Sequence, residues 1–189
     1  MQATPSRLNL VLLLPERFQT VRLVGRCPSL LDVPKIFDGW AQDTEVVRYL
    51  VWKPHTEMSS LEQWMASVIA SFGTSDRNEY VLAQCDREDQ PIGMISLRVD
   101  GHGVNFGYVI RRDLWGLGFA SEALRYLVDW SLQQDGISRA WAVCDVANAA
   151  SARVMEKAGL QKEGVLRSWA VHPNISPTPR DVLCYAKTK

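Results

Sequence analysis

The sequence predicts a single α/β domain with a mixed, largely antiparallel sheet of about seven strands and about four helices on its two faces. Three observations support this fold class. Short polar turns separate several alternating segments, and strands joined in this way pair antiparallel. One amphipathic helix separates the segments 104–110 and 139–144, and such a crossover places its two strands parallel. The chain has 189 residues, 47% of them hydrophobic, which is enough for one packed core.

The N-terminal half is predicted to form a strand, two helices and three further strands. Alternation predicts the first strand over Gln19–Val24. Asp32 is expected to cap a helix that runs to about Trp40, and Ser59 or Ser60 to cap a second helix that Gly73 ends. The three strands are expected at Glu79–Cys85, Pro91–Val99 and Val104–Ile110, joined by turns at 86–90 and 100–103.

The C-terminal half continues with a helix, a strand, a helix and two strands. A broad apolar face predicts a helix from Phe119 that Asp135-Gly136 ends. The other elements are expected at Arg139–Cys144, Asn148–Ala158, Leu160–Trp169 and Val182–Ala186. The predicted domain therefore covers residues 19–187. Residues 1–18 form an N-terminal extension to which no element is assigned.

Composition excludes several classes of function. Lys plus Arg and Asp plus Glu each number 21, so the chain lacks the basic surplus of a dedicated nucleic-acid binder. The 4 cysteines and 3 histidines are scattered, which argues against a metal site or a disulfide framework. The early apolar run at 10–14 is too short to span a membrane. We therefore expect a soluble cytoplasmic protein that binds no metal, nucleic acid or membrane; the oligomeric state stays open.

The segment Gly116-Leu117-Gly118-Phe119-Ala120 carries the strongest chemical signal. Small residues where a helix begins let a phosphate approach the free backbone amides of the first turn. The alternative is a tight strand-to-helix turn without a ligand. No Lys-Ser/Thr pair follows the second glycine, so the segment is not a Walker P-loop. A dinucleotide fingerprint is also a poor match, because Ser121 occupies the third glycine position and a βαβαβ order is absent.

The stretch Gly107–Gly164 resembles the core of the GNAT family of N-acetyltransferases, within it the branch of ribosomal-protein N-terminal (RimJ/RimL-type) acetyltransferases. The family's motif, Gln/Arg-x-x-Gly-x-Gly/Ala, falls on Trp115–Ala120, where Gly118 and Ala120 match and Trp115 replaces the polar first residue. The branch's Glu-Ala-Leu follows at 122–124. A second motif of the family matches four positions, which are Asn148, Ser151, Gly159 and Leu160.

The resemblance implies a GNAT fold whose sheet is splayed between the fourth and fifth predicted strands, and acetyl-CoA as cosubstrate. The pantetheine arm would pair with the freed edge at Val109 and Ile110. Asn148 would contact the same arm, and Ser151 would lie near the sulfur as a catalytic residue. From the residues alone, the simpler interpretation is favoured, in which Asn148 is a helix N-cap and Ser151 a solvated serine of the first turn. The backbone amides of Gly116, Leu117, Gly118, Phe119 and Ala120 would bind the pyrophosphate, and Trp115 would also contact the cofactor.

The implied reaction is direct acetyl transfer to a primary amine of a small molecule or a peptide, for example a protein N-terminal α-amine. The predicted strand 104–110 carries no acidic residue that could act as a base. Two segments are expected to wall an acceptor pocket, Trp52–His55 and Val171–Asp181, although both also read as surface connections. Two other functions stay open, a non-catalytic acyl-CoA sensor or partner-binding protein of the same fold and a dinucleotide-binding oxidoreductase. The general base stays unassigned among Glu79, Asp145, His172 and Asp181.

Overall fold

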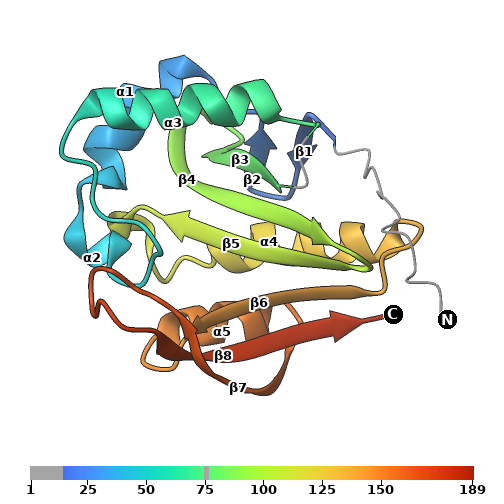
Figure 1. Ribbon diagram of the computed structural model, residues 1–189. Coiled ribbons are helices and arrows are strands. Elements are labelled where there is room, and N and C mark those ends of the chain that lie inside the picture. The colour runs from blue at the N-terminus through green and yellow to red at the C-terminus, as the bar shows by residue number, and fades with distance from the viewer. Residues whose placement is uncertain (1–14, 75–76) are drawn as a thin grey trace, which may run out of the picture.

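The computed structural model describes residues 15–74 and 77–189. Its centre is one sheet of eight strands in the order β1-β2-β3-β4-β5-β6-β8-β7, with helices on both faces (Figure 1). All neighbouring strands pair antiparallel except β5 and β6, which are parallel. The predicted mixed α/β fold is therefore confirmed. The strands are β1 Arg17–Gln19, β2 Leu23–Arg26, β3 Arg77–Gln84, β4 Arg87–Asp100, β5 Gly103–Ile110, β6 Arg139–Asp145, β7 Gln161–Ala170 and β8 Arg180–Thr188.

The extra strand comes from a hairpin at the N-terminal end of the domain. The single strand predicted at Gln19–Val24 is wrong, because the chain turns between β1 and β2. Thr20 closes this turn: its amide donates to Leu23 O at 2.8 Å, and its hydroxyl accepts from Leu23 N–H at 3.0 Å. The first strand thus begins at Arg17, within the stretch predicted as an extension. Residues 1–14 of that extension lie outside the described residues.

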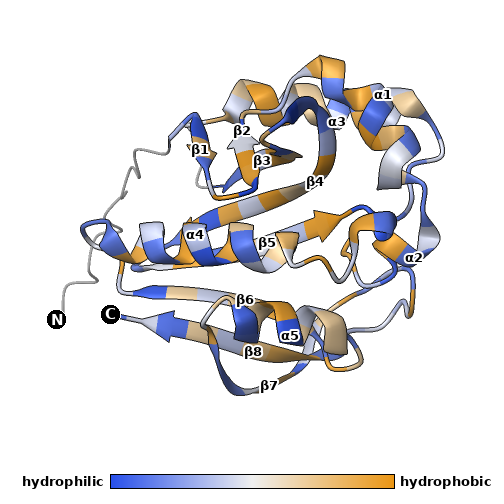
Figure 2. Ribbon diagram, turned by 180° about the vertical axis from the view of Figure 1, so that it is seen from behind, coloured by the Kyte–Doolittle hydropathy of each residue, from blue (hydrophilic) through white to orange (hydrophobic). Residues whose placement is uncertain are grey.

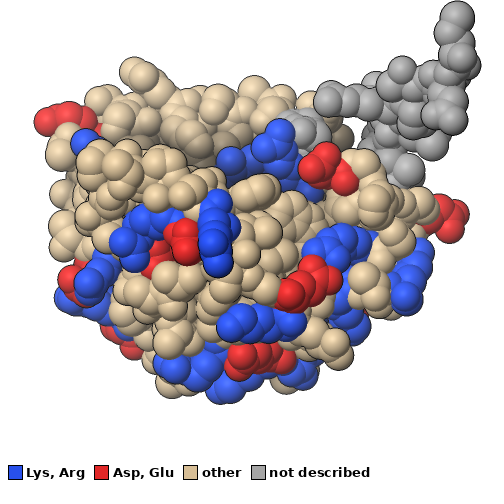
Figure 3. Space-filling model, turned by 60° about the horizontal axis from the view of Figure 1, so that its bottom comes forward, with Lys and Arg blue, Asp and Glu red and all other residues tan. Residues whose placement is uncertain are grey.

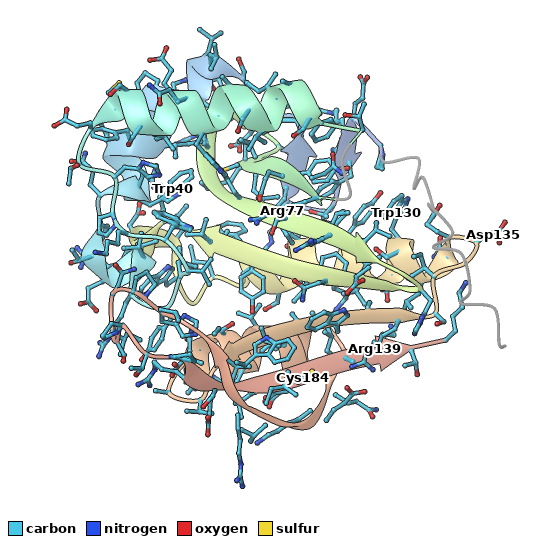
Figure 4. The ribbon with its side chains drawn as sticks, viewed as in Figure 1. Trp40, Arg77, Trp130, Asp135, Arg139 and Cys184 are labelled. Atoms are coloured by element: carbon cyan, nitrogen blue, oxygen red, sulfur yellow. The ribbon has the colours of Figure 1, made fainter. Side chains whose placement is uncertain are left out.

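A first layer of helices covers one face of the sheet over β3 and β4. Its elements are η1 Leu30–Asp32, α1 Val33–Ile36, η2 Phe37–Ala41, α2 Thr44–Val47 and α3 Met58–Ser71. Trp40, labelled in Figure 4, is buried in the cluster that joins these helices to Val81 and Met94. Asp32 is the N-cap residue of α1 as predicted, but its side chain makes no bond to that helix, and Ser29 caps the preceding turn η1. The cap predicted at Ser59 or Ser60 is wrong, because α3 begins at Met58. Asp32 instead accepts the Ser29 amide at 2.9 Å and completes a capping box.

A second layer, α4 Phe119–Gln133 and α5 Ala149–Lys157, covers the opposite face. Figure 2, seen from behind, shows α4 lying over β5 and α5 over β6 and β8. The main core fills the space between these helices and the sheet, and its members include Leu124, Leu127, Phe106 and Met155. This face of the sheet is therefore closed along most of its length.

The parallel pair β5 and β6 separates partway along its length. Pairing runs from Gly103↔Arg139 to Phe106↔Ala142 and then stops, although both strands continue. Residues 107–110 of β5 thus face a gap toward residues 143–145 of β6. The splay expected between these strands is confirmed.

On the side of the sheet that carries the first helical layer, the part formed by β6, β8 and β7 is left uncovered. Arg139 on β6 and Cys184 on β8 lie on this open area (Figure 4), which forms a hollow of about 420 Å³ with Trp141 and Trp169. On the face seen in Figure 3, basic and acidic side chains are interleaved among the described residues, in keeping with the zero formal net charge. Among the described residues, no helix is long and apolar enough to cross a membrane.

Candidate active site

The loop that follows β5 ends in two glycines with left-handed backbones. After the turn η3 Arg112–Leu114, Gly116 has φ 80° and Gly118 has φ 83°. Gly118 is the N-cap of α4, and no side chain caps this end of the helix. The amides of the first turn of α4 thus lack intrahelical partners and point toward the loop. This arrangement suits an anion, because backbone donors and the positive end of the helix dipole coincide.

The turn between β1 and β2 fastens this loop. Arg22 Nη1 donates to Leu117 O at 3.0 Å, and Arg22 Nε donates to Glu122 at 2.6 Å. Glu122 also accepts from the Thr20 hydroxyl at 2.6 Å. Burial raises the pKa of Glu122, but these bonds lower it more, so the net shift is downward. Sequence reasoning missed this clamp, since a Thr-x-Arg turn and a helical glutamate about 100 residues apart carry no joint local signal.

At the gap, the backbone groups of β5 that point away from β4 belong to Tyr108 and Ile110. Arg111 N–H donates to Ile92 O on the β4 side, and in a strand the backbone groups alternate sides. Those of Val109 therefore face β4, and its carbonyl lies close to Gly93. Trp115 Nε1 donates to Ile110 O at 2.8 Å, which ties the loop to the end of β5. Of the two residues expected at the edge, Ile110 faces the gap with its backbone and Val109 does not.

The second motif lies at the start of α5, against the other side of β5. Asn148 caps the helix, because its Oδ1 accepts from Ser151 N–H at 3.0 Å. The Ser151 hydroxyl is 2.7 Å from the Tyr108 hydroxyl, so the structure joins the α5 N-terminus to the free part of β5. Burial raises the pKa of Tyr108 well above its usual value, which keeps this phenol protonated at neutral pH. Sequence reasoning did not single out Tyr108, and its contact with Ser151 spans 43 residues.

The two segments expected to wall an acceptor pocket are in contact. The side-chain amide of Asn174, in the loop between β7 and β8, donates to both Val47 O and Trp52 O at 2.7 Å. Tyr49 also reaches across to Ala147 O at 3.3 Å. Figure 1 shows the β7–β8 loop passing the C-terminal ends of β5 and β6 to reach the α2 region. The gap thus opens beside this pair of segments.

The four candidate bases lie in different surroundings. Glu79 faces α3 with Arg77, in a hollow formed with Trp64 and Val68, on a strand that is not adjacent to the gap. Asp181 accepts from Ser168 N–H at 2.9 Å. Asp145 and His172 both lie at the C-terminal end of β6, with Asp145 fully buried and His172 5% exposed.

The site has the features that a coenzyme A ester requires. Gly116 has no atom within 4 Å of an added Cβ, and at Gly118 only Arg22 comes within that range, so the backbone at both glycines is open to an approaching phosphate. An extended arm can reach from there along the free edge of β5 to the Tyr108–Ser151 pair. The described residues contain no cluster of three or more residues that could hold a metal ion.

A sheet opened between two parallel strands, with a glycine-rich helix start beside the gap, defines the class of acetyl-CoA-dependent acetyltransferases. Residues 22–161 match the family model described as "Acetyltransferase (GNAT) domain". The chain therefore belongs to the GNAT acetyltransferase family.

Similar proteins agree with this assignment. The chain is 31% identical over 146 residues to "Uncharacterized N-acetyltransferase YoaA" of Bacillus subtilis (strain 168), covering 75% of this chain and 80% of the relative. Two solved structures share the fold. The self-immunity acetyltransferase MccE, in complex with acetyl-CoA and AMP, has a TM-score of 0.81 at 17% identity, covering 94% and 98% of the two chains. RimL, a ribosomal L7/L12 α-N-protein acetyltransferase in complex with coenzyme A, has a TM-score of 0.77 at 19% identity, covering 89% and 95%.

Proposed function

We propose that this acetyltransferase moves the acetyl group of acetyl-CoA directly onto a primary amine, and that its preferred acceptor is the N-terminal α-amine of a polypeptide. The gap between β5 and β6 carries this proposal. It joins the glycine loop, the free edge of β5 and the Tyr108–Ser151 pair into one continuous path.

Each part of this path has a role toward acetyl-CoA, which supplies an activated acetyl thioester. The amides between Gly116 and Ala120 bind the pyrophosphate, with Arg22 adding positive charge beside Gly118. The backbone groups of Tyr108 and the N–H of Ile110 pair with the pantetheine arm, while Ile110 O stays bonded to Trp115. Trp115 and Leu117, which are 49% and 53% exposed, flank the loop and supply apolar contact.

Ser151 and Tyr108 act together on the departing sulfur. Tyr108 stays protonated, and its single hydrogen has two acceptors on Ser151, the backbone O at 3.1 Å and Oγ at 2.7 Å. In the proposed arrangement the hydrogen is donated to Oγ. The hydrogen of the Ser151 hydroxyl is then free to be donated to the thiolate that develops on the sulfur. The N-terminus of α5 adds favourable potential for that negative charge. Asn148 holds this end of the helix in place.

Two arguments favour an N-terminal α-amine as the acceptor. The amine must be unprotonated to attack, and an α-amine titrates near pH ~8, whereas a lysine titrates near ~10.4. The open face of β6 and β8 also gives room for a chain that continues beyond the amine. RimL, described as a ribosomal L7/L12 α-N-protein acetyltransferase, offers an analogy at the level of the fold.

An acceptor screen tests the proposal. Three acceptors are compared at neutral pH by thiol release: a lysine-free peptide with a free N-terminus, the same peptide blocked at its N-terminus and carrying one lysine, and a polyamine. We expect kcat/KM for the free N-terminus to exceed that for the blocked peptide at least about 10-fold, because far more of the α-amine is unprotonated. A preference for the blocked peptide or the polyamine would overturn the α-amine assignment. Acetyl-CoA binding without transfer to any of the three would instead indicate the non-catalytic alternative.

A further inference from the structure

We propose that His172 is the general base that takes the proton of the acceptor amine, an inference that rests on the proposed acetyl transfer. His172 is only 5% exposed, and neither ring nitrogen has a hydrogen-bond partner among the described residues. Leaving a buried polar group unpaired costs roughly 1–3 kcal/mol. Such a group is expected where a ligand supplies the missing partner.

The register of the sheet places His172 on the acceptor side of the gap. Val109 packs against the hydrophobic cluster that contains Trp40, on the side of the first helical layer. Because side chains alternate along a strand, Gly107 and Asn105 face the same side. Asn105 pairs with Trp141, and the same alternation along β6 brings Asp145 to that face. His172 Nε2 lies 3.8 Å from Asp145 Oδ2. Tyr108 and Ser151 lie on the opposite face. The acceptor amine and the groups that donate hydrogen bonds to the sulfur therefore lie on opposite sides of the gap.

The loop around His172 is held in place. Ile175 N–H and Ser176 N–H both donate to His172 O, at 2.9 and 3.0 Å. Asn174 then anchors the loop to Val47 and Trp52. The imidazole therefore has a defined position beside the end of β6, within one of the two predicted acceptor walls, as a proton acceptor needs.

The charged groups nearest His172 are Asp145 and Arg180, which are paired with each other. Burial raises the pKa of Asp145, but bonds from Arg180 and the Ala147 amide lower it more, so the carboxylate is ionised. Arg180 donates to it at 2.5 and 3.1 Å and balances its charge. Hydrogen bonds to Asp145 raise the pKa of Arg180, and the negative charge of Asp145 adds to this shift. The imidazole thus lies beside a neutral ion pair, whose carboxylate can stabilise the imidazolium once it forms.

The step balances as follows. The amine nitrogen forms a bond to the acetyl carbon, and the bond from that carbon to sulfur breaks. The amine proton passes to a ring nitrogen of His172, and the sulfur departs with its electron pair as a thiolate that accepts a hydrogen bond from the Ser151 hydroxyl and then takes a proton from solvent. His172 then returns its proton to solvent before the next turnover. Asp145 is a poorer base, because its oxygens are occupied by Arg180 and the Ala147 amide.

The test compares the titration of His172 with the pH dependence of turnover. In protein labelled with ¹⁵N-histidine and saturated with coenzyme A and the acceptor peptide, NMR gives the pKa of His172 in the complex that kcat reports, with His172→Gln used to assign its signals. We expect kcat at saturating substrates to rise with pH through that same pKa and then to level off. We also expect the acceptor peptide to shift the His172 ring resonances. A kcat profile that does not follow the measured pKa, or unshifted resonances, would overturn the assignment even if the variant failed to fold.

His172→Gln provides the second arm, with His102→Gln as its control. His102 lies in the turn before β5, at the other end of that strand from the gap. We expect His172→Gln to lower kcat at pH 7 by about 100-fold or more while leaving the Kd of acetyl-CoA and the melting temperature near wild type. His102→Gln should keep wild-type kcat. Equal kcat values for the two variants would overturn the assignment of His172 as general base and leave the proposed acetyl transfer standing. Failure of the wild type to transfer acetyl groups would overturn the proposed function, and the base with it.

Discussion

Gly118 adopts a left-handed backbone at the point where α4 begins, and this single conformation shapes the cofactor loop. Valine at this position would be strained by roughly 1–3 kcal/mol, and its branched side chain would project toward Arg22 and the approaching phosphate. We predict that Gly118→Val abolishes measurable acetyl-CoA binding. The measurement is calorimetric titration of a variant shown to be folded.

Gly101→Val is the matched control for that experiment. Gly101 has φ 58° in the β4–β5 turn, with no atom near an added Cβ, so valine there brings similar strain far from the loop. Its affinity for acetyl-CoA should stay near the wild-type value. If Gly118→Val bound acetyl-CoA within a few-fold of this control, the loop would not hold the phosphates.

The Tyr108–Ser151 pair gives a second prediction for single residues. A hydrogen bond to a charge that develops during the reaction is worth roughly 1.5–3 kcal/mol, or about 10- to 100-fold in rate. Ser151→Ala and Tyr108→Phe should each lower kcat by such a factor with little change in the Kd of acetyl-CoA. The effects should not add in the double variant, because both residues serve one proton path. Wild-type turnover by Ser151→Ala would reduce the serine to an ordinary helix residue.

At the scale of elements, the clamp between the β1–β2 turn and α4 holds the cofactor loop. Glu122 links Thr20 and Arg22 to the first turn of the helix, and its side chain is only 18% exposed. Losing its charge should cost about 1–2 kcal/mol, because the Arg22 pair and the favourable helix-dipole interaction both weaken. We predict that Glu122→Gln lowers the free energy of unfolding by this amount at pH 7.

The pH dependence of that difference has a defined sign. The folded pKa of Glu122 is lowered, so its contribution is fully present above the unfolded value of about 4.3 and disappears as pH falls through the folded pKa. The difference in unfolding free energy between wild type and Glu122→Gln should therefore be constant from about pH 6 to 8 and disappear on acidification below about pH 4. Urea unfolding at several pH values measures this difference. A difference that persists in acid would contradict the assigned role of the carboxylate.

Sequence patterns predicted most elements of this fold, because long apolar periodicities such as that of α4 reflect the core directly. The β1–β2 hairpin escaped prediction because its turn contains neither glycine nor proline and relies on the Thr20 side chain. The glycine loop and the cap at Asn148 were recognisable, since each is a local motif. Tyr108 and the surroundings of His172 depend on contacts between distant segments, which periodicity and spacing do not reveal.

For the whole molecule, the opening of the sheet between β5 and β6 connects fold and function. Helices close one face along most of the sheet, whereas the other face stays open beyond β5. In the proposed mechanism, one side of the gap takes acetyl-CoA and the other the acceptor. The central claim is therefore that a single site binds both substrates and transfers the acetyl group directly.

The most direct test follows both products of one reaction. Purified protein is incubated with acetyl-CoA and the lysine-free peptide, and free thiol and acetylated peptide are measured over the same time course, the latter by mass spectrometry. The account predicts that thiol and acetylated peptide form in a one-to-one ratio, with the acetyl group on the N-terminal nitrogen. Gly118→Val should form neither. Thiol release without acetylated peptide, or acetylated peptide formed equally well by Gly118→Val, would contradict direct transfer at this site.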